Sequence, residues 1–230
     1  MPLILCIETA TTVCSVALAS GGKLIILKEQ NEGYTHAEKI TLFIQDVMKQ
    51  AGKKLSELDA VAVSMGPGSY TGLRIGVSTA KGLCYALDKP MIAIPTLRSM
   101  AASQLQTLNF KPQTLFCPMI DARRMEVYCA VYDEKLNEIR NTAAEIITEN
   151  SFSDLLKDHQ MIFFGDGALK CKEIFSHHSH AAFVDDVFPS AKNMIEMAEK
   201  KFTQKQFEDV ALFEPFYLKD FVDGKSFNAK

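Results

Sequence analysis

The sequence predicts an α/β protein in which one order of elements, βββαβαβα, occurs twice in succession. The chain has 230 residues, 47% hydrophobic and 23% charged, which is typical of one large or two small globular domains. Apolar runs of strand type alternate with segments of helical periodicity along the chain. Pro112 breaks the helical pattern within residues 109–113. We therefore divide the chain into units at residues 1–110 and 111–230.

The first unit begins with three predicted strands. Apolar runs at residues 3–7 and 13–19 are of β type. Gly21 and Gly22 form a two-residue hairpin signal that leads into a third run at residues 24–27. An antiparallel meander is expected.

A helix and two strand-helix pairs complete the first unit. Apolar residues within 36–51 recur at i, i+3, i+4, i+7 and i+11, the spacing of one helix face, and Gly52 ends this helix. Strands are expected at residues 60–64 and 91–94, and helices at residues 71–87 and 96–105. Thr96 is the expected N-cap of the last helix.

The second unit repeats this order, with a turn expected at residues 122–124. Strands are expected at residues 115–120, 126–132, 161–164 and 181–184, and within 138–147. Helices are expected at residues 151–156, 168–175 and 189–202. Repetition of element order with little sequence identity is typical of a duplicated fold. The unit corresponds to the ribonuclease-H-like half of the actin, Hsp70 and hexokinase architecture, so we predict an actin-like (ASKHA) fold.

Charge and cysteine usage limit the classes of function. The net charge is −3, whereas proteins that grip a phosphate backbone usually carry a dense Lys/Arg surface. If nucleic acid is involved, we expect another protein to hold most of it. The six cysteines contain no C-x-x-C pair and are interpreted as reduced core residues of a cytoplasmic protein. Glu8 interrupts the first apolar run, so neither export nor membrane anchoring is expected.

Two acidic residues follow the first strand of each unit. Glu8 and Asp121 occupy corresponding positions, at strand ends where α/β proteins collect ligands. In enzymes of this architecture, the cleft between the halves holds nucleotide phosphates and a carboxylate-bound cation. The alternative is that both are turn carboxylates that accept backbone N–H groups.

A glycine-rich loop runs from a predicted strand into a predicted helix. Gly66, Gly68, Ser69 and Thr71 lie where a helix N-terminus offers free N–H groups to an anion such as a nucleotide phosphate. The loop is neither a Walker A sequence nor G-x-G-x-x-G. These four residues are therefore candidate anion or nucleotide ligands on the local pattern alone.

The helix after this loop carries a row of small residues. Gly72, Gly76 and Ala80 follow one another at i+4, although interior glycines lower helix propensity. Close approach of another backbone explains such a row, either the chain's own sheet or a partner subunit. Arg74 and Lys81 either steer an acidic partner or are simply solvated.

The remaining polar residues favour structural roles. His177, His178 and His180 lie in a polar connection without companion ligands and indicate an exposed turn, not a metal site. His36 has no second histidine at i+4, which favours a capping or loop-packing role. Asp166 precedes a predicted helix as an acidic N-cap, with a cleft carboxylate as the alternative.

Four motifs in order resemble the bacterial TsaB family, also called YeaZ. They are VSMGPGSYTGLRIG at residues 63–76, ILCIETATT at 4–12, IDARRMEVY at 120–128 and EPFYL at 214–218. The resemblance implies an actin-like fold and a role in making threonylcarbamoyladenosine at position 37 of tRNAs that read ANN codons.

The catalytic paralogue TsaD looks similar through the Gly-Pro-Gly stretch and carries a metal-binding His-x-x-x-His pair after the next strand. Alignment of the strands places Thr96 and Met100 at those positions, where neither residue replaces an imidazole. No catalytic or metal-binding residue is therefore assigned to this chain. The alternative is a stand-alone actin-like ATPase or kinase, or a metallohydrolase.

The resemblance also implies partners. It predicts a cytoplasmic, non-catalytic subunit that binds TsaD through the helices near residues 36–50 and 71–87 and activates it together with the ATPase TsaE. ATP and the metal would belong to the partner subunits, and tRNA would be reached only through the complex. Alone, the chain is expected to form a homodimer through the same surface.

Overall fold

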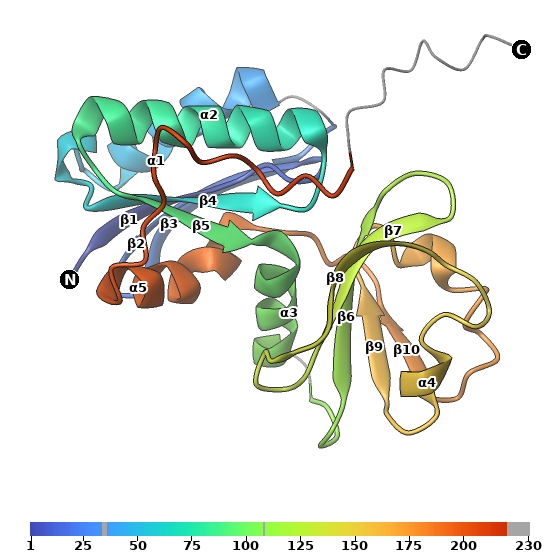
Figure 1. Cartoon of the computed structure of the whole chain (residues 1–230). Helices are drawn as coiled ribbons and strands as arrows, with labels where there is room; N and C mark the ends of the chain where they lie inside the picture. The colour runs from blue at the N-terminus through green and yellow to red at the C-terminus, as the bar shows by residue number, and fades with distance from the viewer. Residues whose placement is uncertain (34–35, 108, 220–230) are drawn as a thin grey trace, which may run out of the picture.

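The computed structural model describes residues 1–33, 36–107 and 109–219, and it shows two lobes that are each built on a five-stranded mixed sheet (Figure 1). The strand orders are β3-β2-β1-β4-β5 in the N-terminal lobe and β10-β9-β6-β7-β8 in the C-terminal lobe. The first three strands of each lobe are antiparallel neighbours, and the later strands are parallel to the first. The repeated strand order of the sequence analysis is thus confirmed.

The N-terminal sheet is buried on both faces. Its strands are β1 (Leu3–Glu8), β2 (Val13–Ser20), β3 (Lys23–Asn31), β4 (Ala60–Gly66) and β5 (Met91–Pro95). The two predicted helices are present as α1 (His36–Gln50) and α2 (Tyr70–Leu87), and both cover one face of the sheet (Figure 1). The apolar runs of β1 and β4 are continuous, not alternating, because helices lie on both sides of them.

The other face of this sheet is covered from the far end of the chain. A 3-10 turn (Ala191–Met194) continues into α5 (Ile195–Thr203), and both pack on β1 and its neighbours. The Lys201 ammonium donates to the Ala93 carbonyl, 2.8 Å away. The helix predicted for residues 189–202 therefore begins later than expected, because Ser190 has an extended backbone (φ −143°, ψ 143°) and precedes the 3-10 turn.

The C-terminal sheet is covered on one face by a helix of the first unit. Its strands are β6 (Leu115–Asp121), β7 (Glu126–Tyr132), β8 (Glu138–Ile146), β9 (Met161–Phe164) and β10 (Ala181–Val184). Helix α3 (Thr96–Thr107) packs on β6 and β7, and α4 (Ser153–Leu156) lies on the opposite face. The two sheets lie in the expected units, residues 1–110 and 111–230, whereas α3 and α5 each pack on the sheet of the other unit.

The helix predicted for residues 168–175 was wrong. This segment is a single 3-10 turn, Leu169–Cys171, followed by further turns. Its apolar residues are buried as expected, and the Phe175 ring stacks on Phe163 with centroids 5.0 Å apart and planes 9° apart. The spacing of apolar residues thus predicted correctly which residues are buried. It did not predict the backbone conformation, because successive turns bury the same residues without a continuous helix.

A strap of residues 207–219, hereafter the C-terminal strap, crosses the N-terminal lobe after α5 (Figure 1). Glu208 pairs with Met91 of β5, and the Lys81 ammonium of α2 donates to the carbonyls of Ala211 and Phe213. The Phe216 N–H donates to the Met65 carbonyl at 2.7 Å. The strap therefore joins β5, α2 and the end of β4.

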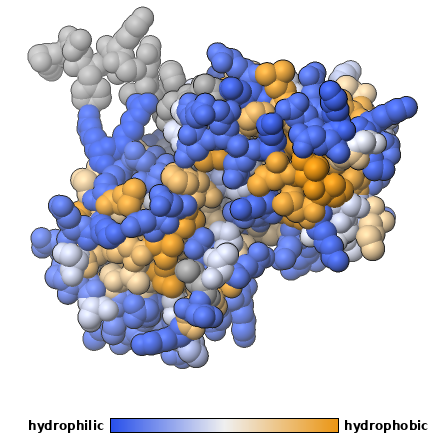
Figure 2. Space-filling view, turned by 180° about the vertical axis from the view of Figure 1, so that it is seen from behind, coloured by the Kyte–Doolittle hydropathy of each residue, from blue (hydrophilic) through white to orange (hydrophobic). Residues whose placement is uncertain are grey.

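Hydrophobic side chains remain at the surface of both lobes, among hydrophilic ones, in the view from behind (Figure 2). In the N-terminal lobe, Leu24 and Ile25 of the edge strand β3 are 45% and 42% exposed. Among the residues that the structure describes, every helix is too short or too polar to span a lipid bilayer.

Candidate functional site

Glu8 ends β1 and is completely buried. Its Oε1 accepts hydrogen bonds from the Ala10 N–H and the Ser64 hydroxyl, both at 2.7 Å. Oε2 has no hydrogen-bond partner among the described residues. Burial raises the pKa of the Glu8 carboxyl to about 7, because the hydrogen bonds offset the desolvation of the charged form only in part. Glu8 thus accepts a backbone N–H in a turn, as the structural alternative in the sequence analysis predicted.

The glycine-rich loop packs against the same turn. The Ser69 N–H donates to the Ala10 carbonyl at 2.7 Å, and the Ser69 hydroxyl caps α2 by accepting from the Gly72 N–H at 3.3 Å. A Cβ on Gly68 would lie 2.3 Å from the Ala10 carbonyl oxygen, so only glycine fits there. The backbone of Ala10 therefore packs directly against the loop that leads into α2.

Gly66 is tied to two other segments. Its N–H donates to the Thr96 hydroxyl at 3.2 Å, and a Cβ on it would lie 2.8 Å from the carbonyl oxygen of Phe216 in the strap. The N–H groups of Gly66, Ser69 and Gly72 are all engaged inside the chain. Thr71 is exposed, and the assignment of Gly66, Gly68, Ser69 and Thr71 as anion ligands stays a prediction.

The small-residue row of α2 faces inward. A Cβ on Gly72 would lie 2.1 Å from the Thr9 carbonyl oxygen, and one on Gly76 would lie 2.2 Å from the Thr9 hydroxyl. Ala80 is fully buried in the core beneath α1 and α2. The interface prediction for Gly72, Gly76 and Ala80 is therefore wrong, and the alternative of packing on the chain's own sheet is correct. The backbone that closely approaches this row belongs to the turn after β1.

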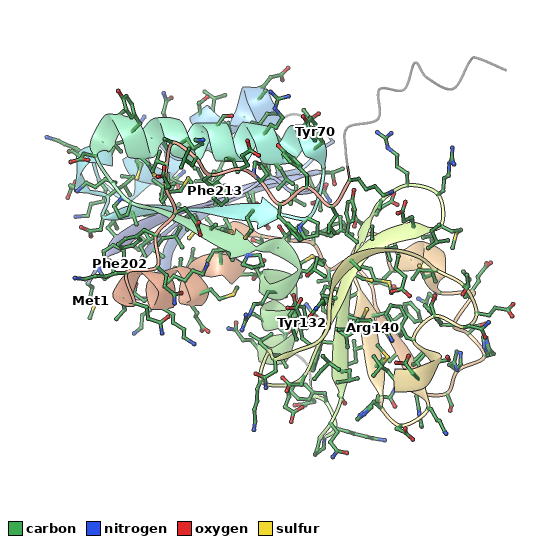
Figure 3. All side chains as sticks on the ribbon, in the orientation of Figure 1. Met1, Tyr70, Tyr132, Arg140, Phe202 and Phe213 are labelled. Atoms are coloured by element: carbon green, nitrogen blue, oxygen red, sulfur yellow. The ribbon has the colours of Figure 1, made fainter. Side chains whose placement is uncertain are left out.

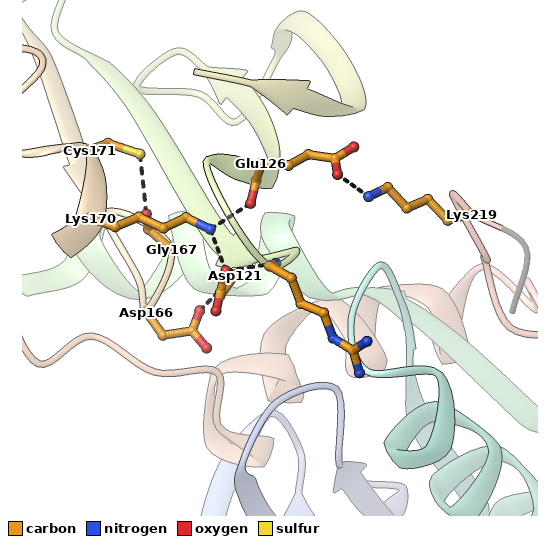
Figure 4. Close-up of polar contacts among 8 residues, drawn as sticks. Asp121, Glu126, Asp166, Gly167, Lys170, Cys171 and Lys219 are labelled. Atoms are coloured by element: carbon orange, nitrogen blue, oxygen red, sulfur yellow. Dashed lines mark hydrogen bonds and ion pairs between the residues drawn. The ribbon is translucent and has the colours of Figure 1, made fainter. Parts of the chain in front are cut away.

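Asp121 lies in the other lobe, in a cluster of charges (Figure 4). The Lys170 ammonium pairs with Asp121 Oδ1 and donates to the Glu126 carbonyl at 2.7 Å. The same Oδ1 accepts from the Arg123 N–H at 2.9 Å. Asp121 thus accepts a backbone N–H as the turn alternative predicted, and it has a lysine partner that the sequence analysis missed.

Asp166 joins the ends of β9 and β6. Its Oδ1 accepts from the Asp121 N–H at 3.1 Å, and burial together with the nearby Asp121 charge raises the pKa of Asp166. Lys170 and Asp121 are 49 residues apart in the sequence, so no local spacing signalled their pairing. The described residues contain no group of three or more His, Cys, Asp or Glu side chains placed to share a metal ion.

Thr96 and Met100 begin α3 where the two lobes meet. Both side chains are fully buried. The Thr96 hydroxyl accepts the Gly66 N–H, and the Met100 methyl group lies 3.0 Å from where a Cβ on Gly165 would be. These two positions are therefore filled by packing and backbone contacts.

The histidines have structural partners. His36 is buried, with Nε2 2.7 Å from the Thr11 carbonyl oxygen, and burial lowers its pKa. This confirms the predicted loop-packing role. His177 and His180 are exposed in a turn, and His178 packs on the Phe175 ring, so the predicted turn is confirmed.

Two cavities border α3. The larger, about 470 Å³, is lined by polar residues that include Glu29, Gln104, Ser190 and Lys192. The smaller, about 340 Å³, lies between Gly66, Arg98, Tyr132, Glu138 and Phe216. Neither is lined by Glu8 or Asp121.

Comparisons with known proteins agree on one family. The family model described as "TsaD: tRNA N6-adenosine threonylcarbamoyltransferase" matches residues 32–222. The chain is 30% identical to the tRNA threonylcarbamoyladenosine biosynthesis protein TsaB of Haemophilus influenzae, over 96% of this chain and 95% of that protein. It is 31% identical to the Escherichia coli protein of the same description, over 99% of both chains.

Solved structures match the fold. YeaZ from Pseudomonas aeruginosa superposes with a TM-score of 0.78 at 23% identity, covering 95% of this chain and 100% of that chain. The ethanolamine utilization protein EutJ from Carboxydothermus hydrogenoformans superposes with a TM-score of 0.51 at 12% identity, covering 86% and 90%. The predicted actin-like, two-lobed α/β fold is confirmed.

Proposed function

The chain belongs to the TsaB (YeaZ) family, and we propose that it serves tRNA threonylcarbamoyladenosine biosynthesis as a non-catalytic subunit. In this role it binds a TsaD-type subunit and, with TsaE, brings that subunit into its active form. ATP and the catalytic metal belong to the partners, and the product is the modified adenosine at position 37 of ANN-decoding tRNAs. Alone, the chain pairs with a second copy through the same surface.

The observation that carries this proposal is the identity of two residues in the first two turns of α3. Thr96 and Met100 stand where the resemblance places the metal-binding histidines of TsaD, and both are buried. A thioether is a soft ligand and a hydroxyl is neutral, so the pair is a poor substitute for two imidazoles. The fold of the catalytic paralogue is therefore kept without its metal ligands.

The outer faces of α1 and α2 supply the partner surface. The two helices lie side by side on the N-terminal sheet, and each exposes a large apolar residue. Tyr85 of α2 is 87% exposed and Leu42 of α1 is 54% exposed. Beside Tyr85 on the exposed side of α2 are Gly82 and Ala86, small residues that let a partner helix come close. This surface replaces the buried glycine row as the proposed interface.

The test is association with the TsaD of the same organism. Size-exclusion chromatography with light scattering of the mixture, beside each protein alone, is expected to give a new heteromeric peak. Together with TsaE, that complex is expected to restore threonylcarbamoylation of unmodified tRNA. Absence of a complex under every nucleotide condition contradicts the proposal, and so does transfer to tRNA by this chain unaided.

A stand-alone ATPase, kinase or metallohydrolase has no specific observation in its favour. Lys170 pairs with one oxygen of the Asp121 carboxylate, and the Ser69 N–H at the start of α2 donates to the Ala10 carbonyl. Calorimetric titration of the isolated chain with ATP and Mg²⁺ is expected to show no binding at high micromolar protein. Saturable binding would return Glu8, Asp121 and the Gly66 loop to consideration as a catalytic cleft.

A further inference from the structure

The smaller of the two cavities, about 340 Å³, is shared by the two lobes. The ends of β4 and β5, the first turn of α3 and the strap line it from one direction, and β7 and β8 of the C-terminal lobe complete it. Tyr132, the last residue of β7, lies beside α3 at this junction (Figure 3). The proposed function leaves this cavity without a role.

The part of the lining from the N-terminal lobe, α3 and the strap is largely apolar. Pro67 and Leu97 are buried, and Phe216 of the strap is 40% exposed. Removal of an aliphatic group from water onto these side chains is favourable, and small-molecule sites typically combine such surface with a few polar groups. A ligand of this cavity is therefore expected to have an apolar part.

Arg98 is the one cation among the lining residues, all of which the structure describes. Its side chain is exposed, and within residues 1–33, 36–107 and 109–219 it has neither a hydrogen bond nor an ion pair. A guanidinium group binds a carboxylate through two parallel N–H···O bonds. Arg98 therefore offers this cavity a position for a carboxylate.

Glu138, at the start of β8, is the one anion of the same lining. Its Oε1 accepts from the Thr142 N–H at 3.1 Å and from the Thr142 hydroxyl at 3.2 Å, and no cation of the described residues pairs with it. Burial and the Glu138 charge raise the pKa of Tyr132, whereas the Arg98 charge opposes this rise. Both charges therefore lie near the Tyr132 hydroxyl, although they do not pair with each other.

Two further carboxylates are close to lining residues in the sequence. Asp133 follows Tyr132 and belongs to the β7–β8 turn, where its Oδ1 accepts two backbone N–H groups at 2.8 Å. Glu214 is exposed on the strap. Neither residue lines the cavity, so a ligand there meets one positive and one negative side chain.

We propose that this cavity binds a free α-amino acid with an aliphatic side chain, its carboxylate on Arg98 and its ammonium group on Glu138. Such a ligand carries both charges on one carbon atom, and its side chain packs on Pro67, Leu97 and Phe216. A plain carboxylic acid would leave Glu138 without a counter-charge, and a plain amine would leave Arg98 without one. The inference goes beyond the proposed function and does not depend on it.

The test is calorimetric titration of the full chain with three matched probes. L-Leucine carries both charges, 2-hydroxy-4-methylpentanoate lacks the ammonium group, and L-leucinamide lacks the carboxylate. L-Leucine is expected to bind saturably, and each analogue about tenfold more weakly, because one charge-assisted hydrogen-bonded contact is lost. The same titrations are made with Arg98→Gln and Glu138→Gln, whose exposed positions leave the fold intact.

Each variant is expected to lose one specific preference. Arg98→Gln is expected to bind L-leucine about tenfold more weakly and no better than L-leucinamide. Glu138→Gln is expected to weaken L-leucine to the same extent and to bind it no better than the hydroxy acid. The controls Lys111→Gln and Glu134→Gln remove exposed charges outside the cavity and are expected to match the wild type.

Three results would overturn the proposal. The first is absence of saturable binding of L-leucine, L-valine and L-methionine by the wild type. The second is equal affinity of the wild type for L-leucine and the hydroxy acid, which would assign the cavity to a plain carboxylate. The third is equal weakening by the cavity variants and the controls. Because the isolated chain is used, failure of the complex with TsaD to assemble leaves this test unaffected.

Discussion

Glu8 and Thr9 show how the turn after β1 organises the N-terminal lobe at the scale of single residues. Glu8 holds the start of the turn through Ala10 and Ser64. The Thr9 hydroxyl donates to the Gly72 carbonyl at 2.8 Å, and the Thr9 backbone and side chain lie against the glycines of α2. Both residues therefore join β1, β4 and α2.

The raised pKa of Glu8 predicts a stability that falls with rising pH. The carboxyl titrates near pH 7 in the folded chain and near 4.5 in the unfolded chain, so the folded state holds the extra proton between these values. Stability is full below pH 4.5 and is lost as pH rises to 7, by up to about 3 kcal/mol. In Glu8→Gln the oxygen that accepts from Ser64 and Ala10 is kept and the charge is removed.

Urea unfolding measured at pH 5 and pH 8 checks this prediction. Glu8→Gln is expected to exceed the wild type in free energy of unfolding at pH 8 and to approach it at pH 5. Glu38→Gln, at an exposed position in the first turn of α1, is the control. If the free energy of unfolding depends on pH in the same way for the wild type and Glu8→Gln, burial does not raise the pKa of this carboxyl.

The glycine row predicts a loss of stability on addition of a single methyl group. Gly76→Ala places a Cβ 2.2 Å from the Thr9 hydroxyl, which its hydrogen bond to Gly72 holds in place. The expected cost is about 1–3 kcal/mol in the free energy of unfolding. Gly82 lies in the same helix with nothing within 4 Å of such a Cβ, so Gly82→Ala is expected to stabilise by about 0.5–1 kcal/mol. Equal melting temperatures for the two variants would refute the packing account.

Helix α2 illustrates, at the scale of elements, how one helix serves two surfaces. Its inner face, with Leu73, Val77 and Ala80, is buried against the sheet. Its outer face exposes Tyr85, and its N-terminal end carries Tyr70 and Arg74 beside the strap. The helix therefore buries one face in its own lobe and exposes the other face to a partner.

The outer face of α2 predicts a specific effect on partner binding. Tyr85→Ala is expected to weaken association with the TsaD-type subunit by about 2 kcal/mol, because exposed aromatic residues at interface centres contribute most of the binding energy. The stability of the isolated chain is expected to stay within about 0.5 kcal/mol of the wild type, since the side chain is 87% exposed. Isothermal titration calorimetry gives the affinity.

Leu169→Ala is the matched control for Tyr85→Ala. Leu169 is also a large exposed apolar residue, at 55% exposure, but it lies in the C-terminal lobe. Its substitution is expected to leave the affinity for the partner unchanged. Equal effects of the two variants, or none from Tyr85→Ala, would remove the outer face of α2 from the proposed interface.

The whole molecule is held together by an exchange of segments between the lobes. Helix α3 leaves the first unit to cover the C-terminal sheet, and α5 with the strap returns to cover the N-terminal sheet. The buried face between β1, β4, β5 and α5 is built from Ile4, Cys6, Ile92, Ile94 and Met194 among others. Neither sheet is therefore complete without the other half of the sequence.

This exchange predicts that residues 1–110 do not fold alone. Without α5, the apolar face of the N-terminal sheet would be exposed, and burial of that face contributes a large part of the favourable free energy of folding. The fragment is expected to show poorly dispersed amide signals in a proton-nitrogen correlation spectrum. Fusion of residues 188–219 to it through a flexible linker is expected to restore dispersion. A well-folded isolated fragment would contradict the prediction.

The sequence by itself determined those strands and helices whose buried residues recur at the regular spacing of the element. The strands and the helices of the first unit follow from apolar runs and helical spacing, because one face of each element must leave water whatever it packs against. The turn of Ala122 to Arg124 and the packing role of His36 were predictable for the same local reason. The repeated order of elements predicted the fold, and the four motifs added the family.

Only the tertiary structure decided which partner each buried surface meets. The row Gly72, Gly76 and Ala80 indicates close approach of a backbone, and Thr9, 63 residues before Gly72, turned out to supply it. Lys170 neutralises Asp121 from 49 positions away, and α5 covers the sheet of the other lobe. Periodicity records that a residue is buried, whereas the identity of its neighbour depends on long-range packing that no local spacing encodes.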